Sequence, residues 1–177
     1  EVWVSDDGSK DNTCAILSAY QKKFGGDRLS INFGPSEGFA ANFLSLTSRP
    51  DIVADYYAYS DQDDIWEPDH LTRALEWLKS VPAGTPALYS SRTRYISEDG
   101  LNLGFSTLFN KPPSFRNALV QSIAGANTMV FNQVAHQLLA KTPDQLNIVS
   151  HDWWAYMLLS GCGGQVFYDP YPGVRYR

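Results

Sequence analysis

Strand-like and helix-like segments alternate along the first half of the chain, and polar turns separate them. Short apolar runs end in turns rich in Asp, Gly and Pro, and each turn leads into a segment whose apolar side chains recur every three or four residues. The expected strands are 3–4, 29–33 and 56–59, and the expected helices run through 17–24, 39–46 and 71–78. Because strands joined by such helices form right-handed crossovers, the pattern predicts an α/β fold, a mostly parallel sheet with helices on both faces.

The second half of the chain has a more mixed pattern. Strands are expected over 88–91, 94–97, 128–131 and 164–168, with a hairpin-type turn at 98–100. Helices are expected over 114–121, 134–140 and 151–161. The chain has 177 residues and shows no internal repeat, so we predict one domain over residues 1–177, given roughly 150 residues per domain.

The charge and cysteine content of the chain limit the kinds of molecule that it is expected to bind. Fourteen Lys and Arg against nineteen Asp and Glu give a net charge of -5, which argues against nucleic acid and anionic membrane surfaces. Cys14 and Cys162 stand far apart, without the spacing of a zinc site or a disulfide framework. No apolar run reaches the roughly 18 residues of a membrane helix, so the expected location is the cytoplasm, with peripheral association at the inner face of the cell membrane as the alternative. Both ends read as interrupted strands, which suggests a piece of a longer gene product.

An acidic run follows the strand expected at 56–59. Asp61, Asp63 and Asp64 place carboxylates so close together that they repel one another, and a divalent cation would relieve that repulsion. Mg²⁺ or Mn²⁺ is usually held by one or two carboxylates together with substrate phosphates. Ligands of parallel sheets bind at the carboxyl ends of strands, where this run and the Asp6-Asp7 turn are expected. A solvated acidic turn is the alternative that this spacing leaves open.

Several ordered motifs resemble the family 2 glycosyltransferases, in particular their bacterial, rhamnosyltransferase-like branch. The resemblance covers nearly the whole chain, and its motifs are 5–13, 32–34, 38–43, 59–71, 125–132 and 151–154. It implies the GT-A fold, a Rossmann-like sheet that binds a nucleotide-activated sugar. The family's first strand and helix are expected to precede Glu1, so the first strand-helix unit of the fold is missing from this sequence.

The resemblance also implies roles for the acidic residues. Asp7 matches the family position that binds the nucleotide base, and Asp6 beside it is a second candidate. Asp61 and Asp63 match the DxD motif, whose carboxylates bind the ribose and the divalent metal, Mn²⁺ or Mg²⁺, on the diphosphate. The metal stabilises the charge that develops on the departing nucleoside diphosphate.

Asp152 matches the family's general base, which deprotonates the acceptor hydroxyl. A base acting opposite the leaving group gives single displacement with inversion at the anomeric carbon. The residue before it is His151, where the family more often has an acidic residue, and both acceptor positioning and a plain surface position are open for it. Gly125 lies where the donor-sugar loop of the family runs, which makes close backbone approach to the sugar plausible.

Aromatic and imidazole side chains offer further candidates. Trp66, Trp153 and Trp154 are suited to stacking on sugar rings, although packing in the core or in loops is the favoured interpretation. His70 and His136 fall within helical patterns and are expected at the surface or as satisfied core residues, not as ligands.

The function implied is transfer of a sugar from a UDP- or dTDP-linked donor to a hydroxyl of a cell-surface glycan or of its lipid-linked precursor. Rhamnose is the common association of this branch. A non-catalytic GT-A-like fragment that binds a nucleotide-sugar or a partner protein is the alternative from another class. A nucleotidyltransferase shares the sheet and the metal carboxylates, but no Gly-rich triphosphate loop with Arg or Lys occurs in the sequence.

Overall fold

The computed structural model describes residues 1–123, 125–143 and 145–177. These residues form two compact units, which are treated separately below. The first unit comprises Glu1–Ile52 and Thr142–His151, and the second comprises Val53–Lys141 and Asp152–Arg177.

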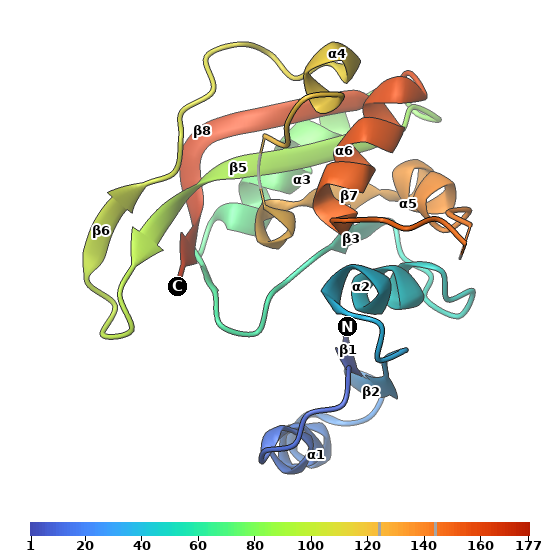
Figure 1. Ribbon diagram of the computed structural model, residues 1–177, viewed down its shortest axis with the longest axis vertical. Helices are drawn as coiled ribbons and strands as arrows, with labels where there is room; N and C mark the ends of the chain where they lie inside the picture. Colours follow the sequence, from blue (N-terminus) through green and yellow to red (C-terminus); the bar gives the residue numbers. More distant parts are fainter. Residues whose placement is uncertain (124, 144) are drawn as a thin grey trace. The chain divides into compact units, whose positions relative to one another are not determined.

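The first unit contains a strand-helix-strand crossover followed by a helix (Figure 1). Its elements are β1 (Val2–Asp6), α1 (Thr13–Phe24), β2 (Leu29–Phe33) and α2 (Phe39–Thr47). Strands β1 and β2 pair in parallel, from Val2 with Leu29 to Asp6 with Phe33. The parallel pairing confirms the crossover that the alternating pattern predicts for this part of the chain.

Little of the first unit is buried. Helix α1 has no buried residue, and the apolar side chains Ile16, Tyr20 and Phe24 on it remain 55%, 51% and 50% exposed. Among the described residues of this unit, the buried apolar side chains are Leu29 of β2 and Ala40 of α2. A two-stranded sheet offers too little apolar surface to cover two helices.

The second unit contains a larger, mixed sheet. Its strands are β3 (Tyr56–Ala58), β4 (Ile65–Trp66), β5 (Ala87–Ile96), β6 (Asn102–Phe105), β7 (Val130–Asn132) and β8 (Gln165–Tyr176). They lie in the order β3-β7-β5-β8-β4, and β6 also pairs with β5. Strands β5 and β8 run parallel to each other, whereas the other pairs in this sheet are antiparallel.

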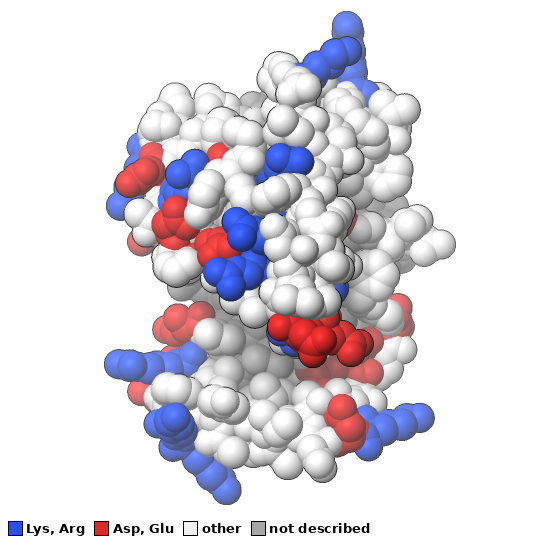
Figure 2. Space-filling view, turned by 90° about the vertical axis from the view of Figure 1, so that its left-hand side faces the viewer, with Lys and Arg blue, Asp and Glu red and all other residues white. Residues whose placement is uncertain are grey.

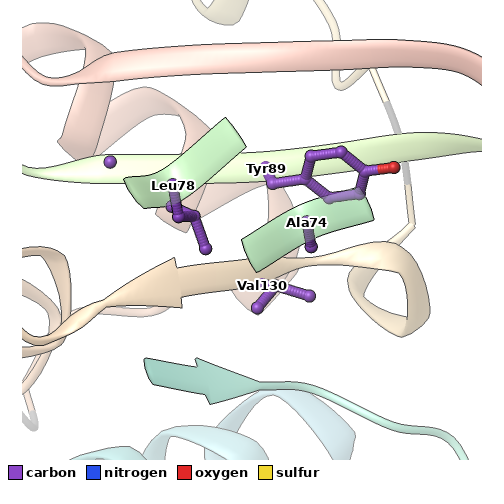
Figure 3. Packing of buried hydrophobic residues seen from close by; sticks show 5 residues of the cluster. Ala74, Leu78, Tyr89 and Val130 are labelled. Atoms are coloured by element: carbon purple, nitrogen blue, oxygen red, sulfur yellow. The ribbon is translucent and has the colours of Figure 1, made fainter. Parts of the chain in front are cut away.

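Helices lie on both faces of this sheet, as Figure 1 shows for α3 and α6. The helical elements are α3 (His70–Ser80), α4 (Phe115–Ala118), the 3-10 turn η1 (Ala126–Thr128), α5 (Gln133–Leu139) and α6 (His151–Gly161), whose first residue belongs to the first unit. Side chains Ala74 and Leu78 of α3 meet Tyr89 of β5 and Val130 of β7 in a buried cluster (Figure 3). This contact is one part of the apolar core of the second unit.

Polar side chains also enter this core. Asp169 of β8 is 4% exposed and accepts hydrogen bonds from Arg73 Nε (2.9 Å), the Tyr89 hydroxyl (2.8 Å) and the Tyr171 backbone N–H (2.9 Å). His70 is fully buried beside the rings of Trp66 and Tyr89, and neither of its ring nitrogens has a hydrogen-bond partner among the described residues. His70 is thus a core residue, but not a satisfied one.

The prediction of a mostly parallel sheet was wrong for the second unit, where antiparallel pairing dominates. The pattern of a single strand does not encode its direction, and the turn after residue 96 and the short β7 bring the chain back against β5 and β3. The strands expected at 88–91 and 94–97 form one strand, β5, and α4 is shorter than the helix expected over 114–121. Within the described residues, no helix has the length and apolarity needed to cross a membrane.

Candidate active site

The acidic run lies in the turn between β3 and β4 of the second unit. The backbone N–H of Tyr59 donates to the Met129 carbonyl (3.2 Å), which ties the start of the turn to the segment before β7. Asp61 and Asp64 are half-buried in this turn, whereas Asp63 is exposed. The turn therefore presents one exposed carboxylate beside two that are partly shielded from water.

The electrostatics of Asp61 show which carboxylates lie near it. Burial is the largest cause that raises the pKa of the Asp61 carboxyl to about 6. The negative charges of Asp64, Asp63 and Asp152 also raise this pKa. The charge of Asp152, in the first turn of α6, is the smallest of these causes and shows that Asp152 lies within electrostatic reach of Asp61.

Asp64 differs from its neighbours because both of its oxygens accept hydrogen bonds. The Asn127 side-chain amide donates to Asp64 Oδ2, and the Arg177 backbone N–H donates to Oδ1 (3.1 Å). Asn127 in turn accepts at its backbone carbonyl a hydrogen bond from Trp66 Nε1 (3.0 Å). Trp66 thus holds the backbone beside the acidic turn, in keeping with the packing interpretation.

Gly125 begins this segment and is exposed. A Cβ atom at Gly125 would lie 2.8 Å from Asn127 Oδ1, too close for ordinary contact. The missing side chain therefore makes room for the Asn127 amide. Approach of a donor sugar to this backbone stays a prediction.

Asp152 is half-buried in the first turn of α6, and its Oδ1 accepts a hydrogen bond from the Trp153 backbone N–H (2.6 Å). The next residue, Trp153, donates from Nε1 to the Ala118 carbonyl (2.6 Å). Tyr156, one turn further, accepts from the Ser114 N–H (2.8 Å) and is fully buried. These contacts fix the direction of α6 within the second unit, and they give Trp153 a packing role.

The predicted nucleotide carboxylates lie in the first unit, at the end of β1. Asp6 is 7% exposed, and its Oδ2 accepts hydrogen bonds from the backbone N–H groups of Gly8 (3.3 Å) and Ser9 (3.2 Å). The hydrogen bond with the Ser9 side chain is the largest of the causes that lower the pKa of Asp6. Asp7 is half-buried, and its Oδ1 accepts from the Ser36 N–H (2.6 Å). Asp6 thus shapes its own turn, and nucleotide binding by Asp6 and Asp7 stays a prediction.

His151 is 3% exposed, so the surface interpretation left open by the sequence was wrong. Within the first unit its ring stacks on Phe43 at 4.2 Å between centroids, and Phe39 meets it edge-on at 6.0 Å. The imidazole is thus buried against two aromatic rings. Acceptor positioning by His151 stays a prediction.

The carboxylates suit a hard divalent cation, which prefers oxygen ligands. In the described ranges, no three His, Cys, Asp or Glu residues are grouped so as to hold a metal by themselves. A cation on Asp61 and Asp63 would therefore take its remaining ligands from phosphate and water, as Mg²⁺ commonly does.

On the face in Figure 2, Lys and Arg side chains lie among Asp and Glu side chains and form no continuous basic surface.

Asn127 is the site residue whose role sequence reasoning missed. It is 2% exposed and stands in a run of buried residues, from Ala126 to Phe131. A buried side-chain amide needs hydrogen-bond partners, so an Asn in such an apolar run is the signal that was available. The partner itself, Asp64, was not visible in the sequence.

Comparisons with known proteins agree with the motifs. Residues 1–135 match the family profile described as Glycosyl transferase family 2. A protein named dTDP-rhamnosyl transferase RfbG, from Shigella flexneri, is 37% identical to this chain over 82 residues, which is 44% of this chain and 27% of that protein. The match thus spans about a quarter of the length of that relative.

Proposed function

The chain belongs to glycosyl transferase family 2, and from that premise we propose that it transfers a sugar from a nucleoside-diphosphate donor to a hydroxyl group. The observation that carries the proposal is that the negative charge of Asp152, on α6, acts on Asp61 in the turn after β3 and helps to raise its pKa. This arrangement puts one further carboxylate beside a pair suited to a metal-bound diphosphate. The acceptor is a cell-surface glycan or its lipid-linked precursor, at the inner face of the cell membrane.

Asp61 and Asp63 hold Mn²⁺ or Mg²⁺ in this proposal. When bound, the cation neutralises charge on the diphosphate that leaves the sugar. Two observations support this role: Asp63 is exposed, and the half-buried Asp61 has no hydrogen-bond donor to its carboxylate among the described residues. Cation binding also relieves the repulsion among these carboxylates.

Asp152 acts as the general base. Its carboxylate accepts the proton of the acceptor hydroxyl while that oxygen bonds to the anomeric carbon. The bond from this carbon to the diphosphate oxygen breaks at the same time, and its electron pair leaves with the nucleoside diphosphate. Attack opposite the departing group inverts the anomeric configuration, as in other single displacements at sugars.

The donor is a dTDP- or UDP-linked sugar, and the similarity to the dTDP-rhamnosyl transferase of Shigella flexneri supports dTDP-rhamnose. Asp7, with Asp6 beside it, recognises the nucleotide base, and the exposed backbone at Gly125 lies along the sugar. Pocket contacts, and not the fold, select the sugar.

Isothermal titration with UDP, dTDP and GDP, each with and without Mn²⁺, tests the donor site. We expect one nucleotide to bind in a metal-dependent manner and Asp63→Ala to abolish that dependence, while the variant keeps the wild-type circular dichroism spectrum. If nucleotide affinity changes neither with Mn²⁺ nor with the Asp63→Ala substitution, the proposed metal site is overturned. If no nucleotide binds and no sugar is transferred from its UDP-, dTDP- or GDP-linked form, a non-catalytic domain is favoured.

A further inference from the structure

The three carboxylates of the acidic turn are not equivalent. Asp64 accepts hydrogen bonds on both oxygens, from the Asn127 amide and the Arg177 backbone. Within the described part of the chain, the carboxylates of Asp61 and Asp63 receive no hydrogen bond. A carboxylate engaged on both oxygens is suited to anchoring the backbone, whereas the other two keep their oxygens for a ligand.

We propose that Asn127 is a positioning residue that holds the acidic turn through Asp64, and that Asp64 is an anchor and not a metal ligand. The inference rests on the proposed function, since Asp61 and Asp63 need to be held in place only if they bind a cation. Ligand groups that are locked before binding lose less conformational freedom when the ligand arrives.

Asn127 holds the turn at two points. Its backbone carbonyl accepts from Trp66 Nε1 at 3.0 Å, and its side-chain amide donates to Asp64 Oδ2. Asp64 and Trp66 are only two residues apart, so one residue fixes both ends of the short segment that closes the acidic turn. Asn127 is 2% exposed, and its amide therefore loses a partner that water would not readily replace if Asp64 moved.

Gly125 completes the arrangement. Its φ of -76° is open to any residue, so backbone conformation does not explain the glycine. A Cβ atom there would lie 2.8 Å from Asn127 Oδ1 and would push the amide away from its present position. A side chain at position 125 would thus displace the Asn127 amide, and Gly125→Ala acts on the same hydrogen bond as a change at Asn127.

The test is Mn²⁺ affinity, read from the electron paramagnetic resonance signal of the free ion, with UDP and dTDP each present. Asn127→Leu and Asp64→Leu each remove the hydrogen bond at similar side-chain size, and each should weaken Mn²⁺ binding about tenfold, the equivalent of one hydrogen bond to a charged group. The double variant should bind no more weakly than either single variant, because both changes break the same bond. Asp64→Asn keeps an acceptor for the Asn127 amide but loses the one for the Arg177 N–H, so it should bind Mn²⁺ more tightly than Asp64→Leu and less tightly than wild type.

Three results would overturn the proposal: wild-type affinity in Asn127→Leu, additive losses in the double variant, or an Asp64→Asn protein as weak as Asp64→Leu. The last result would make Asp64 a metal ligand. Gly125→Ala should reproduce part of the loss, while Gly26→Ala is a matched control, because a Cβ at Gly26 meets nothing within 4 Å.

The exchanged pair Asn127→Asp with Asp64→Asn guards against variants that fail to fold. It keeps the net charge and reverses the direction of the hydrogen bond, so it should bind Mn²⁺ better than Asn127→Asp alone. Urea unfolding of wild type, Asn127→Leu, Asp64→Leu and the double variant measures the coupling between the two positions without any metal. If Asn127 and Asp64 are coupled in stability but the wild-type chain binds no Mn²⁺, the proposed function is overturned. If the two positions show no coupling, the positioning role of Asn127 is overturned.

Discussion

Helices α1 and α3 both carry apolar side chains at helical spacing, yet they are buried to very different degrees. Ala74 and Leu78 of α3 are 0% and 3% exposed, whereas α1 has no buried residue. The difference lies in the sheets, because α3 packs on β5 and β7, whereas the described residues of the first unit provide α1 with the two-stranded sheet of β1 and β2. Stability is therefore expected to reside in the second unit, which also carries the acidic turn and Asp152.

The largest expected effect is on kcat, and it distinguishes residues of the second unit that catalyse transfer from residues of the first unit that bind the nucleotide. Asp152→Asn, in the second unit, should lower kcat by about 100-fold or more, since the general base is lost, while donor affinity stays near wild type. Asp7→Asn, in the first unit, should instead weaken nucleotide binding with kcat largely retained. Steady-state kinetics with calorimetry of donor binding distinguish the two.

If Asp152→Asn and Asp7→Asn lower kcat equally, the assignment of catalysis to Asp152 and of nucleotide recognition to Asp7 is wrong. Circular dichroism of each variant is the control for folding. A fall in nucleotide affinity in Asp152→Asn alone would move recognition into the second unit.

The same contrast explains what the sequence could predict. Local patterns placed β2 at residues 29–33 and began α6 at His151, because turn residues and helical spacing act over a few positions. The antiparallel pairing of β7 with β5 and β3 depends on partners far along the chain, and no local pattern reports it. The pattern on α1 predicted a helix but not that its apolar side chains stay exposed, because exposure depends on what lies against them.

For the site, the motifs picked out Asp61, Asp63 and Asp152 as candidates, and the charges of Asp63 and Asp152 are among the causes that raise the pKa of Asp61. The bond between Asn127 and Asp64 joins residues 63 positions apart, so it escaped prediction. A motif records which residues a chemistry needs, but it does not record what holds them in place.

Matched truncations in the two helices should give the next largest effect. Leu78→Ala in α3 removes a buried side chain and should lower the free energy of unfolding by about 3 kcal/mol. Ile16→Ala in α1 removes a side chain that is 55% exposed and should cost less than about 1 kcal/mol. Urea titration followed by circular dichroism measures both, and equal costs would show that α1 is covered in solution.

A buried histidine should make the second unit sensitive to acid. Burial lowers the pKa of His70 to about 4, against 6.5 for an ordinary histidine, although the negative charges of Asp69 and Asp169 oppose the shift. Between pH 6.5 and 4 the unfolded chain binds a proton that the folded chain excludes. The free energy of unfolding should therefore fall as the pH drops through this window, by up to about 3 kcal/mol at pH 4.

His70→Phe is the matched variant, because neither ring nitrogen has a partner in the described structure and no hydrogen bond is lost. Urea unfolding at several pH values should show a flatter dependence for this variant than for wild type. An unchanged slope would mean that His70 is not the group that titrates.

The smallest effect compares an ion pair from each unit. Arg73 pairs with Asp169, which is buried, while Arg49 pairs with Asp51 at the surface, where 38% and 51% of the two side chains are exposed. Arg73→Met should cost about 1–2 kcal/mol, because the Tyr89 hydroxyl still donates to the buried Asp169 carboxylate that is left behind. Arg49→Met should cost less than about 1 kcal/mol, since water solvates Asp51 and salt screens the pair. Urea titration at low and high salt measures both, and a larger cost for Arg49→Met would reverse the ranking of the two units.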